Sequence, residues 1–384
     1  MKVVVVGAGL GGLNTVEGLR RAGHTGPLTL IGDETPWPYD RPPLSKTALQ
    51  TGSPAPLLRA VEDYPELDLD LRLGVAATRL DARAREVALA DGTVLAYDAL
   101  VLAPGAVPRH LPGDWLPGMH VLRTQDDATA LRADVVRHGA VTVVGGGFIG
   151  CEVAASARHL GAEVDLVELL PGPLVRVLGP VLAERLSALH IDHGVRLHGG
   201  VGVKAVLGDG AVEGLELADG RVLDPRVVLV GLGVIPATAW LADALQLAPD
   251  GGIVCDEAGL ATDGVWAVGD AAAWGTTGRV EHWTSAMEQA AAVAQSVLGS
   301  PTADTSVPYI WSDQYDSTLQ CLGEVRPDTE AEVLEVGQGL AALHVREGRL
   351  VGAALLDLRK QTGRVRRVLA ADGSVEDARA ALLR

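Results

Sequence analysis

Three glycines near the N-terminus, Gly7, Gly9 and Gly12, have the spacing of a turn that binds a dinucleotide. An apolar run of strand length leads into them, and apolar residues at helical spacing follow. In such a turn the first glycine makes the bend, the second lets the backbone approach a pyrophosphate, and the third lets helix and strand pack closely. A second apolar run, Leu28 to Ile31, leads to Asp33, whose carboxylate can accept ribose hydroxyls. The segment therefore predicts a dinucleotide whose pyrophosphate sits at a helix N-terminus.

The same order of features recurs near the middle of the chain. Gly145, Gly147 and Gly150 follow a strand-like run, and a helix rich in small residues and a second strand ending at Glu168 come after them. Two complete copies predict two dinucleotides on one chain. The simplest pair is flavin adenine dinucleotide (FAD) at one copy and a nicotinamide dinucleotide at the other.

A further carboxylate indicates which copy takes the flavin. An apolar run ends at Gly269-Asp270, where a carboxylate can accept hydrogen bonds from the ribityl hydroxyls of a flavin; the alternative is an ordinary Gly-Asp turn. The segment from Tyr97 to Arg109 is typical of a strand that enters a Pro-Gly turn, and such a turn can cross the flavin side. These segments favour FAD at the first glycine motif.

Length, composition and charge set the class of protein. A chain of 384 residues exceeds what one hydrophobic core usually organises, so two or three domains are expected. Its 48% apolar residues and 47 glycines favour an α/β protein with many tight turns. The net charge of -17 argues against broad nucleic-acid binding, which needs a basic surface.

The cysteines and the longest apolar runs bear on metals and location. Cys151, Cys255 and Cys321 lie far apart without a CxxC or metal-ligand spacing, so no metal site is predicted and a reducing compartment is favoured. Uncharged runs such as Val227 to Ala242 are shorter than the ~18 residues of a membrane span, and the N-terminus begins with an apolar strand rather than a signal peptide. We expect a soluble, cytoplasmic protein without a membrane partner.

With these motifs, the chain resembles the two-dinucleotide flavoprotein reductases of the glutathione-reductase-like fold. PYDRPPLSK at 38–46, APGAVPR at 103–109 and VWAVGDA at 265–271 carry the resemblance. EHWTSAMEQA at 281–290 and YIWSDQYD at 309–316 make it similar, within that group, to the NADH-dependent ferredoxin reductases that serve oxygenases and haem monooxygenases. The resemblance extends over nearly the whole chain.

The resemblance implies an α/β fold of two Rossmann-like domains and a C-terminal α+β domain. The FAD domain would comprise residues 1–108 and 227–300, the nicotinamide domain 109–226, and the C-terminal domain 301–384. In the last part, the sequence itself predicts a hairpin turn at Arg346–Arg349. It also predicts four strands there: Leu319–Val325, Glu332–Val336, Leu340–Val345 and Leu350–Leu356.

The resemblance also assigns the flavin residues. Gly7, Gly9 and Gly12 would face the FAD pyrophosphate and Asp33 the adenosine ribose, with Glu34 as the alternative. Asp270 would bind the ribityl chain. In the proline-rich loop, Arg41 would complement the adenine nucleotide part, and Lys46 would reach the isoalloxazine, where a fixed cation favours the electron-rich reduced flavin. Trp283, which directly precedes a predicted helix from Thr284 to Leu298, either walls the flavin ring or belongs to the core.

At the second site, Gly145, Gly147 and Gly150 would take the pyrophosphate of the nicotinamide dinucleotide. Glu168 would pair the ribose diol and repel a 2′-phosphate, and no arginine follows it before Arg176, so NADH is predicted over NADPH. Glu152 either lies near the nicotinamide or is a carboxylate at a helix start.

The absence of cysteine decides the route of the electrons. Disulfide reductases of this fold carry redox cysteines after the first glycine motif, whereas residues 35–60 contain none. The mechanism implied is hydride transfer from NADH to FAD, followed by two one-electron steps to an iron-sulfur ferredoxin. Five cations gather in one stretch that either steers this acidic partner or forms a solvated helix face. They are Arg359, Lys360, Arg364, Arg366 and Arg367.

Two alternative functions fit the same sequence. One is an NADH oxidase, or a quinone or rubredoxin reductase, of the same fold. The other is a flavin-binding interaction protein that senses NADH, as in relatives of apoptosis-inducing factor that share RPPLSK. Trp311, in WSDQY, would lie at the flavin edge facing the partner or would pack between domains.

Overall fold

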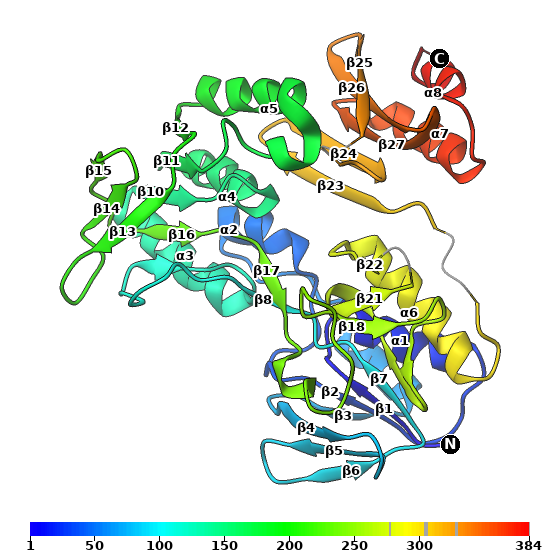
Figure 1. The fold of residues 1–384 in the computed structure, drawn as a ribbon. Helices are drawn as coiled ribbons and strands as arrows, with labels where there is room; N and C mark the ends of the chain where they lie inside the picture. The colour runs from blue at the N-terminus through cyan, green and yellow to red at the C-terminus, as the bar shows by residue number, and fades with distance from the viewer. Residues whose placement is uncertain (276–277, 303–305, 327–328, 384) are drawn as a thin grey trace. The chain divides into compact units, whose positions relative to one another are not determined.

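The computed structural model describes residues 1–275, 278–302, 306–326 and 329–383 (Figure 1). The chain forms two compact units. Unit 1 comprises Met1–Asp40, Pro56–Val107 and Val234–Ser306, and unit 2 comprises Arg41–Ala55, Pro108–Gly233 and Val307–Arg384. Unit 2 thus holds the second glycine motif, the C-terminal sheet and the segment 41–55. The division into three domains predicted from the sequence stays a prediction.

Unit 1 is built on a largely parallel sheet in the order β19-β20-β7-β1-β2-β3. The central strands β1 (Val3–Val6), β2 (Leu28–Ile31) and β7 (Ala99–Leu102) pair in parallel, and every residue in them is buried. Burial on both faces explains why these strands are continuous apolar runs rather than alternating ones. The sheet is completed by β3 (Asp70–Arg72), β20 (Val265–Ala267) and the antiparallel β19 (Leu260–Thr262).

Two helices of unit 1 pack on each other, α1 (Leu10–Arg21) and α6 (Trp283–Val297). The contact is close because Gly18 faces α6: a Cβ there would lie 2.9 Å from that of Ala294. The observed α6 agrees with the helix predicted from Thr284 to Leu298. Unit 1 also contains β4 (Ala77–Asp81), β5 (Glu86–Leu89), β6 (Val94–Ala96), β17 (Val234–Pro236), β18 (Ile253–Cys255), β21 (Ala272–Trp274), β22 (Gly278–Arg279) and the 3₁₀ turns η2 (Val61–Leu67), η3 (Ala239–Leu241) and η4 (Gly269–Ala271), while β8 (Ala106–Pro108) ends at the first residue of unit 2.

Unit 2 contains a second parallel sheet, in the order β12-β11-β10-β16-β9. Its strands are β9 (Met119–His120), β10 (Ala140–Val144), β11 (Glu163–Glu168), β12 (Val195–Gly199) and β16 (Val228–Val230). The helices α3 (Gln125–His138), α4 (Phe148–His159) and α5 (Val175–Asp192) belong to the same unit, as does a small antiparallel sheet of β13 (Val203–Leu207), β14 (Gly214–Leu217) and β15 (Val222–Leu223). Leu131 of α3, Val153 of α4 and Leu166 of β11 lie in one buried cluster, which joins these two helices to the sheet.

The proline-rich loop begins a helix. Residues Pro42–Ser45 form the 3₁₀ turn η1, with prolines at its first two positions, and α2 (Thr47–Thr51) follows. Proline suits the start of a helix because the donor it lacks has no partner there. Leu49 lies in the buried cluster of unit 2, which explains why segment 41–55 groups with that unit.

The C-terminal part is an antiparallel sheet in the order β23-β24-β27-β26-β25. Its strands are β23 (Tyr309–Gln314), β24 (Ser317–Gly323), β25 (Glu330–Val336), β26 (Gly339–Arg346) and β27 (Arg349–Leu356). The predicted turn at Arg346–Arg349 joins β26 to β27, with positive φ at Glu347 and Gly348. Two helices, α7 (Arg359–Ala370) and α8 (Val375–Leu383), close the chain. In the described residues, no helix combines the length and apolar character needed to cross a membrane.

Candidate dinucleotide-binding and redox site

The first glycine turn connects β1 to α1 in the geometry expected for a pyrophosphate. Gly7 has φ of 103°, and a Cβ there would lie 1.9 Å from the carbonyl oxygen of Ala103. A Cβ at Gly12 would lie 1.8 Å from the oxygen of Gly7, so the helix packs directly on the turn. At Gly9, in contrast, a Cβ would meet no described atom within 4 Å. No described side chain caps the N-terminus of α1. The open space and the bare helix end fit a dinucleotide phosphate.

The second glycine turn repeats this geometry between β10 and α4. Gly145 has φ of 107°, and its Cβ would lie 2.4 Å from the oxygen of Gly231. The Cβ of a residue at Gly150 would approach the oxygen of Gly145 to 1.9 Å. Gly147 again has no described atom within 4 Å of such a Cβ, and no described side chain caps α4. Unit 2 therefore contains a second glycine turn whose geometry fits a dinucleotide.

Glu168 lies at the end of β11, beside the second turn. Its Oε2 accepts a hydrogen bond of 2.6 Å from the backbone N–H of Gly146, and its Oε1 accepts one of 2.8 Å from Leu170. The carboxylate is thereby held against the turn, and each oxygen keeps a lone pair for a ribose hydroxyl.

The acids after β2 have different surroundings. Asp33 is exposed, whereas Glu34 is half-buried and accepts a hydrogen bond from the hydroxyl of Tyr39. This difference favours Asp33 over Glu34 as the ribose ligand that the sequence predicts.

Asp270 and Trp283 both belong to unit 1 and both are half-buried. Asp270 follows β20 in the turn η4, and Trp283 begins α6 and donates a hydrogen bond of 2.8 Å to Oδ1 of Asp40. His282 was not predicted as a site residue. Burial lowers the pKa of His282 against the opposing effect of Asp270, and its Nδ1 is buried with no hydrogen-bond partner in the part of the chain that the structure describes. An unpaired buried nitrogen beside Asp270 fits a bound polar group.

The two cations of the proline-rich loop lie in unit 2. Arg41 donates a hydrogen bond to the backbone oxygen of Arg123. Lys46 forms an ion pair with Glu152, whose side chain is almost fully buried. The same carboxylate accepts hydrogen bonds from the hydroxyls of Ser45, at 2.5 Å, and Ser312, at 2.7 Å. The structure thus joins two predicted catalytic residues, Lys46 and Glu152, in one polar cluster.

The cysteines are free and buried. Burial raises the pKa of the Cys255 and Cys321 thiols to about 12, and it raises that of Cys151 further. Because the thiolate is the reactive form, none of the three is suited to redox exchange at neutral pH.

The predicted basic stretch is the first part of α7. Arg359 is paired with Asp313 at 2.7 Å, and Arg366 donates to the backbone of Val307 and lies 5.9 Å from the ring centre of Tyr309. Lys360 and Arg367 are exposed and Arg364 is half-buried. We call the five cations the basic α7 cluster. Trp311 stacks on Tyr309 within unit 2, with ring centres 5.8 Å apart.

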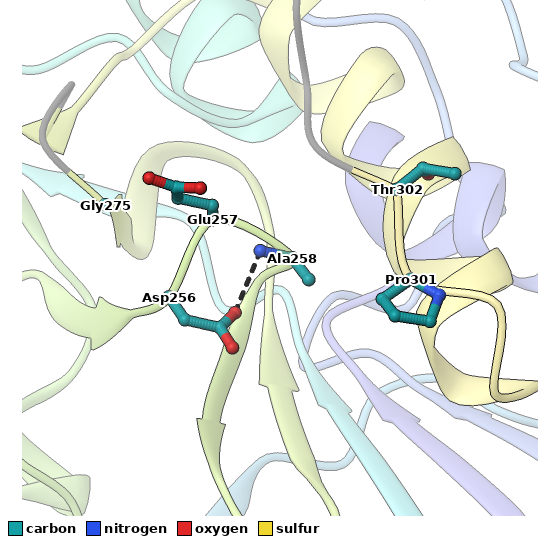
Figure 2. Close-up of a pocket in the computed structure, with 6 residues that line it drawn as sticks. All are labelled: Asp256, Glu257, Ala258, Gly275, Pro301 and Thr302. Atoms are coloured by element: carbon teal, nitrogen blue, oxygen red, sulfur yellow. Dashed lines mark hydrogen bonds between the residues drawn. The ribbon is translucent and has the colours of Figure 1, made fainter.

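Figure 2 shows a surface hollow elsewhere in unit 1, and none of the predicted site residues lines it. Local backbone groups hold one of its acidic side chains, because Oδ1 of Asp256 accepts hydrogen bonds of 2.9 Å from the backbone N–H groups of Ala258 and Leu260. The lining residues are Asp256, Glu257, Ala258, Gly275, Pro301 and Thr302.

Two largely parallel sheets, each with a glycine turn that leads into a helix without a described side-chain cap, are typical of an oxidoreductase that binds two dinucleotides. The comparisons with known proteins agree with this class. The family model "Pyridine nucleotide-disulphide oxidoreductase" matches residues 1–290, and the model "Reductase C-terminal" matches residues 309–382. The chain therefore belongs to the pyridine nucleotide-disulphide oxidoreductase family.

Three relatives match along nearly their whole length. Rhodocoxin reductase of Rhodococcus erythropolis is 36% identical over 97% of this chain and 90% of its own. The ferredoxin–NAD(+) reductase component of the anthranilate 1,2-dioxygenase system of Burkholderia cepacia is 37% identical over 97% of this chain and 95% of its own. The crystal structure of the ferredoxin reductase for the CYP199A2 system of Rhodopseudomonas palustris has a TM-score of 0.93 at 34% identity, covering 99% of this chain and 97% of its own. The chain is an oxidoreductase, and family membership implies FAD and NAD(H) as its cofactors.

Proposed function

We propose that this oxidoreductase passes electrons from NADH through FAD to a one-electron iron-sulfur ferredoxin that serves an oxygenase or a haem monooxygenase. The observation that carries the proposal is the pairing of two bare glycine cradles with three buried, unreactive cysteines. Without a thiol to relay them, electrons leave from the flavin itself. The names of the ferredoxin reductases among its relatives support the same acceptor.

Residues of unit 1 would bind FAD. Gly7, Gly9 and Gly12 would leave room for the pyrophosphate at the N-terminus of α1, and Asp33 would hold the adenosine ribose. Asp270 would accept hydrogen bonds from the ribityl chain. Trp283 would wall the ring, and its hydrogen bond to Asp40 would fix the indole plane.

Residues of unit 2 would bind NADH. Gly145, Gly147 and Gly150 would take its pyrophosphate, and Glu168 would accept the ribose hydroxyls. A carboxylate held rigidly by two backbone N–H groups disfavours an additional 2′-phosphate, so NADH is preferred to NADPH.

Lys46, Arg41 and Glu152 have roles proposed from the sequence resemblance. Lys46 would favour the reduced isoalloxazine through its charge, and Arg41 would complement the adenine nucleotide part. Glu152 would hold the ammonium of Lys46 in place and lie near the nicotinamide. Bound FAD would supply the conversion of a two-electron donor into a one-electron donor.

The basic α7 cluster would steer the acidic ferredoxin towards unit 2. A cytoplasmic location belongs to the same proposal, because free, buried cysteines are typical of a reducing compartment.

The proposal is tested by an anaerobic titration of the FAD-loaded protein with NADH, followed by a panel of iron-sulfur ferredoxins with cytochrome c as reporter. We expect stoichiometric bleaching of the flavin and rapid, ferredoxin-dependent reduction of cytochrome c. Slow NADH oxidation with a long-lived charge-transfer complex and no turnover with any ferredoxin would instead support the interaction-protein alternative.

A further inference from the structure

A continuous row of side-chain hydrogen bonds in unit 2 ends on Glu152. The hydroxyl of Tyr315 lies 2.9 Å from Nδ1 of His190, and Nε2 of His190 lies 3.1 Å from Oε1 of Gln314. Nε2 of Gln314 lies 3.2 Å from the hydroxyl of Ser312, which lies 2.7 Å from Oε1 of Glu152. We call this row the Tyr315-to-Glu152 chain. Of its five members, the sequence predicts a site role for Glu152 alone.

The Tyr315-to-Glu152 chain connects three elements of unit 2 that are far apart in sequence. His190 is in the last turn of α5, Ser312 and Gln314 are on β23, and Glu152 lies beyond the first turn of α4, in its N-terminal half. Figure 1 labels these three elements. Its interior is buried: Ser312 and His190 are 0% exposed, Gln314 is 1% and Glu152 is 3%. The side-chain polar atoms of Ser312, Gln314 and His190 therefore depend on their neighbours in this row for their hydrogen bonds.

The direction of every hydrogen bond follows from the carboxylate. An ionised carboxylate only accepts, so the hydroxyl of Ser312 donates to Glu152. The oxygen of Ser312 then accepts from the amide nitrogen of Gln314, which turns the amide oxygen of Gln314 towards the imidazole. As a result, all the donors between the imidazole and the carboxylate point towards Glu152.

The same logic fixes the protonation of His190. Nε2 must carry the proton that the oxygen of Gln314 accepts, which leaves Nδ1 to accept from the hydroxyl of Tyr315. Burial lowers the pKa of His190 to about 4, with a smaller contribution from His193, so the ring is neutral at pH 7. The Tyr315 end of the Tyr315-to-Glu152 chain is held in place, because the ring of Tyr315 stacks on that of His193 with 3.7 Å between the ring centres.

We infer that the Tyr315-to-Glu152 chain positions the carboxylate of Glu152 and, through it, the ammonium of Lys46. Aligned hydrogen bonds polarise one another, so the bond from Ser312 to the carboxylate is strengthened by the bonds behind it. Ser45, Ser312 and Lys46 together engage both carboxylate oxygens, so Glu152 is confined to one orientation. Ser312, Gln314 and His190 are positioning residues for the reductase chemistry. This inference rests on the proposed role of Lys46.

The first test needs no turnover. In FAD-loaded protein with ¹⁵N-labelled histidine, long-range ¹H–¹⁵N spectra report the tautomer of His190, whose signals are identified by their loss in His190→Asn. We expect the Nε2–H tautomer in the wild type. Ser312→Ala and Glu152→Gln should give a mixture of both tautomers, because the direction of the chain is then no longer imposed. A His190 that is mainly Nδ1–H in the wild type, or unchanged in both variants, would overturn the inference.

The second test measures the bound flavin. Lys46→Ala should make its midpoint potential more negative, and Ser312→Ala should shift it in the same direction by less. The rate of flavin bleaching by NADH in Ser312→Ala should fall on the order of tenfold, the effect of losing one hydrogen bond to a charged group. Ser187→Ala, which removes a hydroxyl of α5 outside the chain, is the matched control and should leave both quantities unchanged.

The outcomes separate the inference from the proposed function. If Lys46→Ala shifts the potential and Ser312→Ala does not, the inference is wrong and the role of Lys46 stands. If Lys46→Ala leaves the potential unchanged, both are wrong. Tyr315→Phe removes only a hydroxyl and serves if Ser312→Ala does not fold. We expect Tyr315→Phe to slow flavin bleaching by NADH, but by less than the roughly tenfold decrease expected for Ser312→Ala. A bleaching rate equal to that of the control Ser187→Ala would count against the inference.

Discussion

The ammonium nitrogen of Lys46 lies 2.8 Å from Oε1 of Glu152, with 18% of the lysine side chain and 4% of the glutamate side chain exposed. Lys46→Ala would leave a buried carboxylate without its cation, which costs about 3 kcal/mol at the lower end of measured values for buried pairs. We therefore expect a lower thermal midpoint, measured by tryptophan fluorescence with excess FAD. The double variant Lys46→Met, Glu152→Gln removes both charges and should recover most of the loss.

The variant Lys46→Ala also separates the electrostatic effect of Lys46 on the flavin from its effect on FAD binding. If the charge of Lys46 favours reduced flavin, Lys46→Ala slows reduction by NADH more than it weakens FAD binding. Stopped-flow bleaching and FAD titration measure the two effects. A variant that loses flavin, yet transfers hydride normally once reconstituted, would make the proline-rich loop a clamp only.

The first glycine turn allows a paired substitution. A methyl group at Gly9 meets no described atom within 4 Å, whereas at Gly7 it meets the oxygen of Ala103 at 1.9 Å. Gly9→Ala should therefore fold and lose FAD affinity by tenfold or more, because the methyl group would occupy the space that we propose for the phosphate. Gly7→Ala should fail to fold. The flavin content of the purified protein measures FAD binding, and circular dichroism measures folding. Full flavin binding by Gly9→Ala would show that the pyrophosphate does not bind at this turn.

Glu168 should set the preference for NADH. We expect kcat/KM for NADH to exceed that for NADPH at least tenfold in the wild type, because the proposed role of the carboxylate is to accept hydrogen bonds from the ribose hydroxyls and to repel a 2′-phosphate. Glu168→Gln keeps the shape, removes the charge and should narrow this ratio. Initial rates with the two cofactors test the prediction, which equal or better rates with NADPH would contradict.

How much the sequence could predict depends on the range of each interaction. The glycine turns, the strand ends at Ile31 and Glu168, and the hairpin at Arg346–Arg349 follow from local backbone chemistry, and all were predicted. The pairing of Lys46 with Glu152 was not, because 106 residues separate them and either residue alone is consistent with a solvated surface charge.

Polar residues inside the fold were the least predictable. Ser312 and Gln314 belong to the motif WSDQY, but serine and glutamine on a strand normally face solvent. The register of the sheet turns these two side chains inward. His282 lies in the segment EHWTSAMEQA, but the sequence predicts no role for its side chain. The assignment of segment 41–55 to unit 2 depends on the packing of Leu49, which no local pattern shows.

The basic α7 cluster should govern ferredoxin association. The double variant Lys360→Glu, Arg364→Glu avoids Arg359 and Arg366, which contact Asp313 and Tyr309. At low salt we expect its rate of ferredoxin-dependent cytochrome c reduction to fall on the order of tenfold and its dependence on ionic strength to weaken. Arg137→Glu, an exposed change at the end of α3, is the control for charge. A wild-type rate insensitive to salt would leave α7 as a solvated helix face.

His190 should make unit 2 sensitive to acid. Its pKa is about 4 in the folded protein and about 6.5 in the unfolded chain, because burial disfavours the charged ring. Below pH 6.5 the unfolded chain binds a proton that the folded protein does not, so stability falls as the pH drops towards 4, by about 3 kcal/mol over that window. In His190→Gln this contribution disappears, and the thermal midpoint should fall less steeply between pH 6.5 and 4 than in the wild type. His138→Gln, at an exposed position on α3, should keep the wild-type slope. Parallel pH profiles of His190→Gln and the wild type would show that the ring accepts a proton without cost and is not held neutral by its surroundings.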